Sequence, residues 1–220
     1  MQFYPVNINI KNRKCLVVGG GAVGARKALT LIKAEACITI VSPKFTSDFT
    51  SIEKLGAKLL QKKYDANDIK GIFLVIAATD DSDLNLEISR QAKKENILCN
   101  IADLPDESDF ILPSIIDRND LMITISTSGK SPALAKKIKQ NLENEFGSEY
   151  SDFLIIMGKI RKKLLGENHS PDKHRIIFHK LVNSQLLDAI KNKDYIQVDD
   201  ILKKILGRDF TYDNLFAGDA

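Results

Sequence analysis

The residues best suited to chemistry form a glycine cluster near the start of the chain. Gly19, Gly21 and Gly24 have the spacing G-x-G-x-x-G within the stretch KCLVVGGGAVGARKA. In such a loop the glycines allow a tight turn, close approach of the backbone to a pyrophosphate, and close packing of a helix on a strand. Because an apolar run precedes the cluster and a helical pattern follows it, we predict a dinucleotide site. The alternative is a glycine-rich turn without a ligand.

Three further segments follow apolar strand patterns, which is where ligands of open α/β sheets bind. They are Ser42-Pro43-Lys44, Thr79-Asp80-Asp81 and residues 100–103. The second expected strand ends without the acid that usually binds an adenosine ribose, and Lys44 would suit a 2′-phosphate. Spacing alone therefore leaves NAD and NADP open. Thr79 is a candidate cofactor contact, whereas Asp80 and Asp81 are better explained as residues that begin a helix.

Asp103 is the candidate catalytic residue. It follows a short buried strand and precedes Leu104-Pro105, a pair that continues neither a strand nor a helix easily. A carboxylate held there is suited to act as a general base once it is partly desolvated. From spacing alone, a turn-forming aspartate is an equal alternative.

A hydroxyl-rich loop at 126–131 reads STSGKS and ends in G-K-S. The phosphate-binding P-loop needs a glycine five residues before Gly129, and Thr124 stands there, so the P-loop pattern fails. What remains is a loop with Lys130 that leads into a helix N-terminus, which suits a carboxylate or a phosphate. An ordinary capping loop is the alternative.

The elements that must position these residues alternate in type over the first half of the chain. Strands are expected at 14–18, 37–41, 57–61, 71–78 and 97–100, and helices at 22–34, 45–55 and 81–94. This alternation predicts an α/β domain with a parallel, doubly wound Rossmann-type sheet over residues 1–112.

The pattern changes after Asp103. Apolar strands at 110–116 and 121–126 flank a turn-rich tetrapeptide, which indicates a hairpin or a sixth strand with an added edge strand. Ser131-Pro132 then begins a long helix that ends near Phe146. We therefore expect a small hairpin-and-helix region at 113–147, an α-helical domain at 148–208 and a loose tail at 209–220.

Composition narrows the class of protein. The 220 residues are 44% hydrophobic and 28% charged, and the net charge of +3 is too small to argue for a nucleic-acid partner. No apolar run approaches the roughly 18 residues that span a bilayer, and no signal-peptide pattern opens the chain. We therefore expect a cytoplasmic protein with neither a nucleic-acid nor a membrane partner.

Metal ligation is not expected. Cys15, Cys37 and Cys99 fall in expected strands without zinc-ligand spacing, so they are interpreted as reduced core residues. The histidines at 169, 174 and 179 lie five residues apart, not the four that place two ligands on one helix face.

Together, these motifs resemble those of the precorrin-2 dehydrogenase/sirohydrochlorin ferrochelatase family, which includes the amino-terminal module of siroheme synthase. The resemblance extends over residues 3–146 and is carried by KCLVVGGGAVGARKA, VSPKF, AATDD, CNIAD, FILPSIIDR and a Ser/Thr-Gly-x-Ser-Pro loop. No methyltransferase module follows, so we expect the stand-alone form.

The resemblance implies a homodimer that oxidises precorrin-2 to sirohydrochlorin with NAD. Some members of the family also insert ferrous iron to give siroheme, and the residues leave both forms open. The resemblance assigns the acid–base role to Asp103. It places dinucleotide contacts at Ala22, Val23, Pro43 and Lys44, and tetrapyrrole contacts at Thr127 and Ser128, with Lys130 suited to the carboxylates of the substrate.

Two other functions stay open. One is a Rossmann domain that senses a nucleotide without catalysis, although the missing acid after the second strand argues against it. The other is an NADP-dependent reductase of another small metabolite, with the helical domain binding the substrate.

Overall fold

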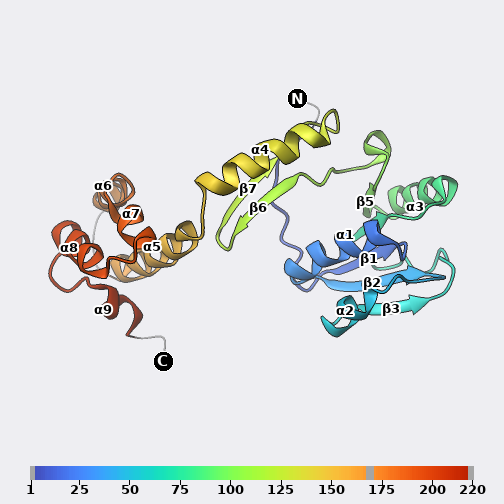
Figure 1. Cartoon of the computed structure of the whole chain (residues 1–220). Helices are drawn as coiled ribbons and strands as arrows, with labels where there is room; N and C mark the ends of the chain where they lie inside the picture. Colours follow the sequence, from blue (N-terminus) through green and yellow to red (C-terminus); the bar gives the residue numbers. More distant parts are fainter. Residues whose placement is uncertain (1–2, 167–170, 218–220) are drawn as a thin grey trace. The chain divides into compact units, whose positions relative to one another are not determined.

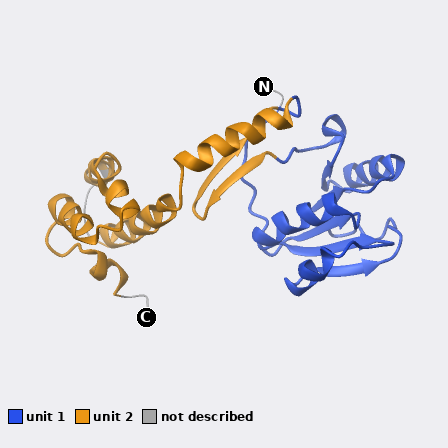
Figure 2. Cartoon of the chain, viewed as in Figure 1, with its two compact units in different colours: residues 1–112, 128–130 blue, residues 113–127, 131–220 orange. Residues whose placement is uncertain are grey.

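The structure, a computed structural model, describes residues 3–166 and 171–217. The chain divides into two compact units, residues 1–112 with 128–130 and residues 113–127 with 131–220 (Figure 2). The finer boundaries expected within the second unit stay a prediction. Of the three histidines, His169 lies outside the described residues.

The first unit is built on a parallel five-stranded sheet with the order β3-β2-β1-β4-β5 (Figure 1). Its strands are β1 (Lys14–Val18), β2 (Cys37–Ser42), β3 (Lys58–Gln61), β4 (Leu74–Ala77) and β5 (Leu98–Ile101). The helices between them are α1 (Ala22–Lys33), α2 (Phe49–Lys54) and α3 (Ser82–Lys94). The predicted Rossmann-type sheet is confirmed, and its strand order reverses between β1 and β4.

Alternate strand residues face two apolar layers, because side chains of a strand point to opposite faces. Cys15 and Val17 of β1 pack on one face with residues of α1 and α2. Leu16 and Val18 pack on the other face with residues of α3. Burial on both faces explains why these strands read as continuous apolar runs.

Three expectations for this unit need correction. β4 is shorter than the expected 71–78, because Gly71 has a positive φ of 70° and breaks the extended run. α2 begins at Phe49 and not at Phe45. Cys37 is exposed and not part of the core, because it pairs with Lys14 at the amino end of β2, where the sheet meets solvent.

The second unit begins with a hairpin and a long helix. β6 (Ser114–Arg118) and β7 (Leu121–Ile125) form a separate antiparallel sheet, joined by a tight turn in which Asn119 has a φ of 59°. The hairpin interpretation is therefore confirmed, with the first strand starting later than expected. α4 (Pro132–Glu145) packs on this hairpin, and its bounds match the predicted helix closely.

The remaining helices form one apolar core. They are α5 (Glu149–Leu165), α6 (Pro171–Val182), α7 (Leu186–Lys191), α8 (Tyr195–Leu206) and α9 (Tyr212–Phe216). The expected loose tail is wrong for residues up to 217. Phe210 and Leu215 are buried in this core, and the backbone N–H of Tyr212 donates to a carboxylate oxygen of Asp199 at 2.7 Å.

Within the described part of the chain, every helix is too short or too polar to cross a bilayer. The cytoplasmic location stays a prediction.

Candidate functional site

The carboxyl ends of β1, β2 and β4 bring three of the predicted loops into contact. Gly19, directly after β1, donates its N–H to the carbonyl of Val41 in β2 at 3.0 Å. It has a φ of 127°, and a Cβ atom there would lie 2.2 Å from the carbonyl oxygen of Ala78 after β4. The predicted tight turn is confirmed, since only glycine fits both the backbone angle and the close approach.

Gly21 and Gly24 have different surroundings. A Cβ atom on Gly24 would lie 2.3 Å from the carbonyl oxygen of Gly19, so its lack of a side chain lets α1 start close to the turn. A Cβ atom on Gly21 would meet no described heavy atom within 4 Å. Gly21 therefore lines open space, as a glycine that faces a ligand should.

The start of α1 is suited to an anion. Gly21 is its N-cap, no side chain caps it, and the first turn holds no acidic residue. Ala22 and Val23 lie in this first turn with their N–H groups at the positive end of the helix dipole. The open cradle at Gly21 and these N–H groups fit a dinucleotide pyrophosphate.

The loop after β2 packs directly on the glycine loop. A Cβ atom on Gly20 would lie 2.0 Å from the carbonyl oxygen of Lys44, and the N–H of Thr46 donates to the carbonyl of Gly20 at 3.0 Å. Gly20 is a packing residue that the G-x-G-x-x-G spacing does not single out. The buried Ser42 hydroxyl donates to the Lys44 carbonyl at 2.7 Å, whereas Pro43 and the side chain of Lys44 are exposed.

A buried asparagine fixes the loop after β4. Asn85 of α3 accepts from the backbone N–H of Thr79 at 3.2 Å and from its hydroxyl at 2.8 Å, and donates to its carbonyl at 3.1 Å. The prediction for Asp81 is confirmed, because its carboxylate caps α3 by accepting from the N–H groups of Asp83 and Leu84. Asn85 was missed, because a polar residue in the first turns of a helix carries no sequence signal that its side chain turns back to the preceding loop.

Asp103 lies directly beyond β5, next to the end of β4. The N–H of Ala102 donates to the carbonyl of Ala77 at 3.0 Å, and the N–H of Leu104 closes a turn on the carbonyl of Ile101 at 3.4 Å. The Asp103 side chain is exposed, so the chain itself does not supply the partial desolvation that was expected. The carboxylate is open to a ligand.

Two further polar groups near this strand end were not predicted as site residues. Asn100 is 5% exposed; its amide donates to the carbonyl of Phe110 at 2.8 Å, and its buried Oδ1 accepts no hydrogen bond from the described residues. Lys27 of α1 is half-buried. Burial, followed by the charge of Arg26, lowers the pKa of Lys27, while the Asp103 carboxylate opposes that shift. Lys27 is thus close enough to Asp103 for their charges to interact.

The hydroxyl-rich loop partly caps α4. The Thr127 hydroxyl accepts from the N–H of Ser131 at 3.1 Å, and the Ser131 hydroxyl accepts from the N–H of Leu134 at 3.2 Å. Residues 128–130 belong to the first unit, where a Cβ atom on Gly129 would lie 3.4 Å from Cγ of Pro105. Gly129 therefore lies beside Pro105, in the turn after Asp103. Its neighbours are Ser128, which has a φ of 52°, and Lys130, which is exposed.

Comparison with known proteins agrees with this geometry. Residues 6–114 match a family model described as putative NAD(P)-binding, and residues 118–145 match one described as the central region of sirohaem biosynthesis proteins. The siroheme synthase of Actinobacillus succinogenes is 36% identical over 194 residues, and siroheme synthase 2 of Cronobacter sakazakii is 34% identical over 208 residues. The chain is thus similar to sirohaem biosynthesis proteins in both of these regions.

The chain spans less than half the length of the two siroheme synthases that it matches. The alignments cover 88% and 94% of this chain but only 41% and 46% of the two siroheme synthases. A solved structure of "SirC, precorrin-2 dehydrogenase" is 26% identical with a TM-score of 0.74, and the match covers 91% of this chain and 100% of that one. The match therefore extends over both units of this chain.

Proposed function

We propose that this chain oxidises precorrin-2 to sirohydrochlorin with NAD, and that Asp103 is the acid–base residue. The observation that supports this most is the exposed Asp103 carboxylate at the same sheet edge as the open cradle at Gly21. A hydride acceptor and a proton acceptor are the two groups that such an oxidation needs. The names of SirC and of the siroheme synthases agree with this reaction.

The glycine loop and Asp103 have different roles in the proposed reaction. When bound, the dinucleotide supplies a nicotinamide that takes a hydride from the reduced macrocycle. The N–H groups at the start of α1 hold the pyrophosphate, and Thr79, fixed by Asn85, lies beside the glycine loop. Asp103 takes the proton that leaves the macrocycle with the hydride, so the substrate loses two hydrogens in all. If ferrous iron is then inserted as a second substrate, Asp103 also accepts protons from the pyrrole nitrogens.

We propose NAD over NADP from the loop after β2. The Ser42 hydroxyl is occupied by the Lys44 carbonyl, and Lys44 is the one cation of the segment 42–46. A 2′-phosphate is usually held by arginine or by several donors. Measured side by side, kcat/KM is expected to be higher with NAD than with NADP.

We also propose that the chain forms a homodimer through the hairpin and α4. Met122 and Leu134 are each 52% exposed, and both belong to this region of the second unit. Exposed apolar side chains on a hairpin and a helix are suited to a self-complementary interface. Equilibrium sedimentation should give twice the chain mass, and a monomer at all concentrations would contradict the proposal.

The first prediction tests Asp103. Asp103→Asn should lower kcat for precorrin-2 oxidation about 100-fold or more, the usual range for loss of a general base, without weakening NAD binding. The assay follows the absorbance of sirohydrochlorin, and ferrous ion is added afterwards to test chelation. Asp106→Asn, an exposed carboxylate three residues further along the same segment, is the matched control and should keep the wild-type rate.

A further inference from the structure

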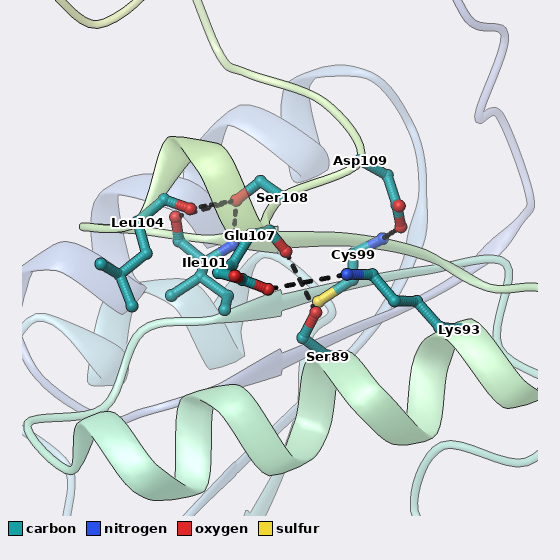
Figure 3. A network of polar contacts seen from close by, with 8 residues as sticks. All are labelled: Ser89, Lys93, Cys99, Ile101, Leu104, Glu107, Ser108 and Asp109. Carbon is teal, nitrogen blue, oxygen red and sulfur yellow. Dashed lines mark hydrogen bonds and ion pairs between the residues drawn. The ribbon is translucent and has the colours of Figure 1, made fainter.

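The outer edge of β5 is bonded to the irregular segment that follows it and not to another strand. β5 is the last strand of the sheet, and the segment after it turns back along its free edge. The Asp109 N–H donates to the carbonyl of Cys99 at 2.8 Å, while an Asp109 carboxylate oxygen accepts from the N–H of Cys99 at 2.9 Å (Figure 3). Asp109 thereby replaces both hydrogen bonds that a neighbouring strand would supply.

Ser108 makes the next contacts along the same edge. Its hydroxyl oxygen accepts from the N–H of Ile101 at 2.8 Å, and its hydroxyl lies 2.9 Å from the Leu104 carbonyl oxygen and 3.3 Å from that of Ile101. A hydroxyl has one proton to donate, and the Leu104 carbonyl is the nearer acceptor. Ser108 therefore links Ile101 and Leu104, the first and last residues of the turn that contains Asp103 (Figure 3).

The returning segment is itself anchored on α3. The hydroxyl of the buried Ser89 donates to the carbonyl of Glu107 at 3.1 Å, and Lys93 lies 3.7 Å from the Glu107 carboxylate. Because Glu107 directly precedes Ser108, these contacts limit where the Ser108 hydroxyl can lie. Figure 3 shows Ser89 and Lys93 projecting from one helix toward this segment.

Asp103 depends on this backbone for its position. Its exposed side chain makes no hydrogen bond with the described residues, so the turn from Ile101 to Leu104, together with the nearby charge of Lys27, sets the position of the carboxylate. We propose that Ser108 is a positioning residue for Asp103, which it serves by fixing both ends of that turn. This inference rests on the proposed function, because it assumes that Asp103 takes part in the reaction.

The test compares Ser108→Ala with Ser108→Thr, which keeps the hydroxyl. Ser108→Ala should lower kcat about tenfold, since a small misplacement of a reacting group costs rate steeply, while KM for NAD stays unchanged. Ser108→Thr should recover most of the rate. Ser108→Cys, close in size but a weak hydrogen-bonding group, should behave like Ser108→Ala and serves if the alanine variant does not fold.

A double mutant separates positioning from general support of the fold. In the Asp103→Asn background Ser108→Ala should lower the residual rate no further, because the carboxylate that it positions is already gone. An equal loss in both backgrounds, or a wild-type kcat for Ser108→Ala, would overturn the inference while leaving the proposed function intact. A wild-type chain that does not oxidise precorrin-2 would instead overturn the proposed function, and the role of Ser108 with it.

Discussion

At the scale of single residues, the glycine spacing predicted backbone behaviour well. Gly19 has the positive φ of a tight turn, Gly24 allows close packing, and Gly21 lines open space. Residues whose role depends on a distant partner were not predictable in the same way. Asn85 and Ser108 are ordinary polar residues in the sequence. Their hydrogen bonds form only because folding places Asn85 of α3 beside Thr79 and places Ser108 beside Ile101 at the end of β5.

Gly21 and Gly24 should respond differently to the same substitution. Gly21→Ala should leave the free energy of unfolding near the wild-type value, because the added methyl group enters open space, but it should weaken NAD binding at least tenfold by blocking the pyrophosphate. Gly24→Ala should cost about 1–3 kcal/mol of stability through overpacking against Gly19. Urea unfolding and calorimetric NAD titration measure the two effects. Equal destabilisation by both variants would contradict these roles.

At the scale of elements, the positions of the strands and helices were largely predictable, because apolar runs, helical periodicity and caps are local signals. The ends of the strands were less predictable. β4 starts after Gly71, which has a positive φ, and Cys37 lies at an exposed strand end. Phe110 and Leu112 were expected in a strand of the hairpin, yet they pack against the core of the Rossmann sheet. Where these two side chains pack depends on which apolar surface folding brings next to them, and the local sequence pattern does not indicate this.

Two buried thiols, Cys15 in β1 and Cys99 in β5, should make the folded chain less stable at alkaline pH. Burial raises the pKa of the Cys15 and Cys99 thiols from 9.0 to about 11. Between these values the unfolded chain loses thiol protons that the folded chain keeps, so the free energy of unfolding should fall as pH rises from 9 to 11. Below pH 9 this contribution is constant.

Urea unfolding over that pH range checks the thiol contribution. A Cys15→Ala/Cys99→Ala variant should show a shallower alkaline decrease than wild type, although Tyr64, whose pKa burial raises to about 12, contributes to the decrease in both. Cys37→Ala, which changes the exposed thiol, is the matched control and should follow wild type. An identical decrease in the double variant would show that the buried thiols do not contribute.

At the scale of the whole molecule, the Rossmann-type sheet and the helical region were both predictable, but the end of the chain was not. A stretch as short as residues 207–217 is too brief to show a clear helical period, and its burial rests on few residues. Phe210 and Leu215 enter the helical core, and the ammonium of Lys163 lies 4.3 Å from the centre of the Phe210 ring. The C-terminal segment is thus part of the second unit's core.

Removing that segment should destabilise the helical core. Leu215→Ala and Phe210→Ala should each lower the free energy of unfolding by about 2–5 kcal/mol, as for other buried side chains of this size, and a stop after Gly207 should cost more than either. Thermal unfolding followed by circular dichroism measures the loss. Asp213→Asn, an exposed change in α9, is the control and should stay within about 0.5 kcal/mol of wild type. Full stability after the truncation would show that this segment is dispensable.

The most direct test of the proposed function mixes the purified wild-type chain and its Asp103→Asn variant with precorrin-2 and NAD in parallel. We expect wild type to form sirohydrochlorin and to reduce an equal amount of NAD, and the variant to bind NAD normally but to turn over about 100-fold more slowly. No sirohydrochlorin from wild type with either NAD or NADP, or a wild-type rate from Asp103→Asn, would contradict the proposal.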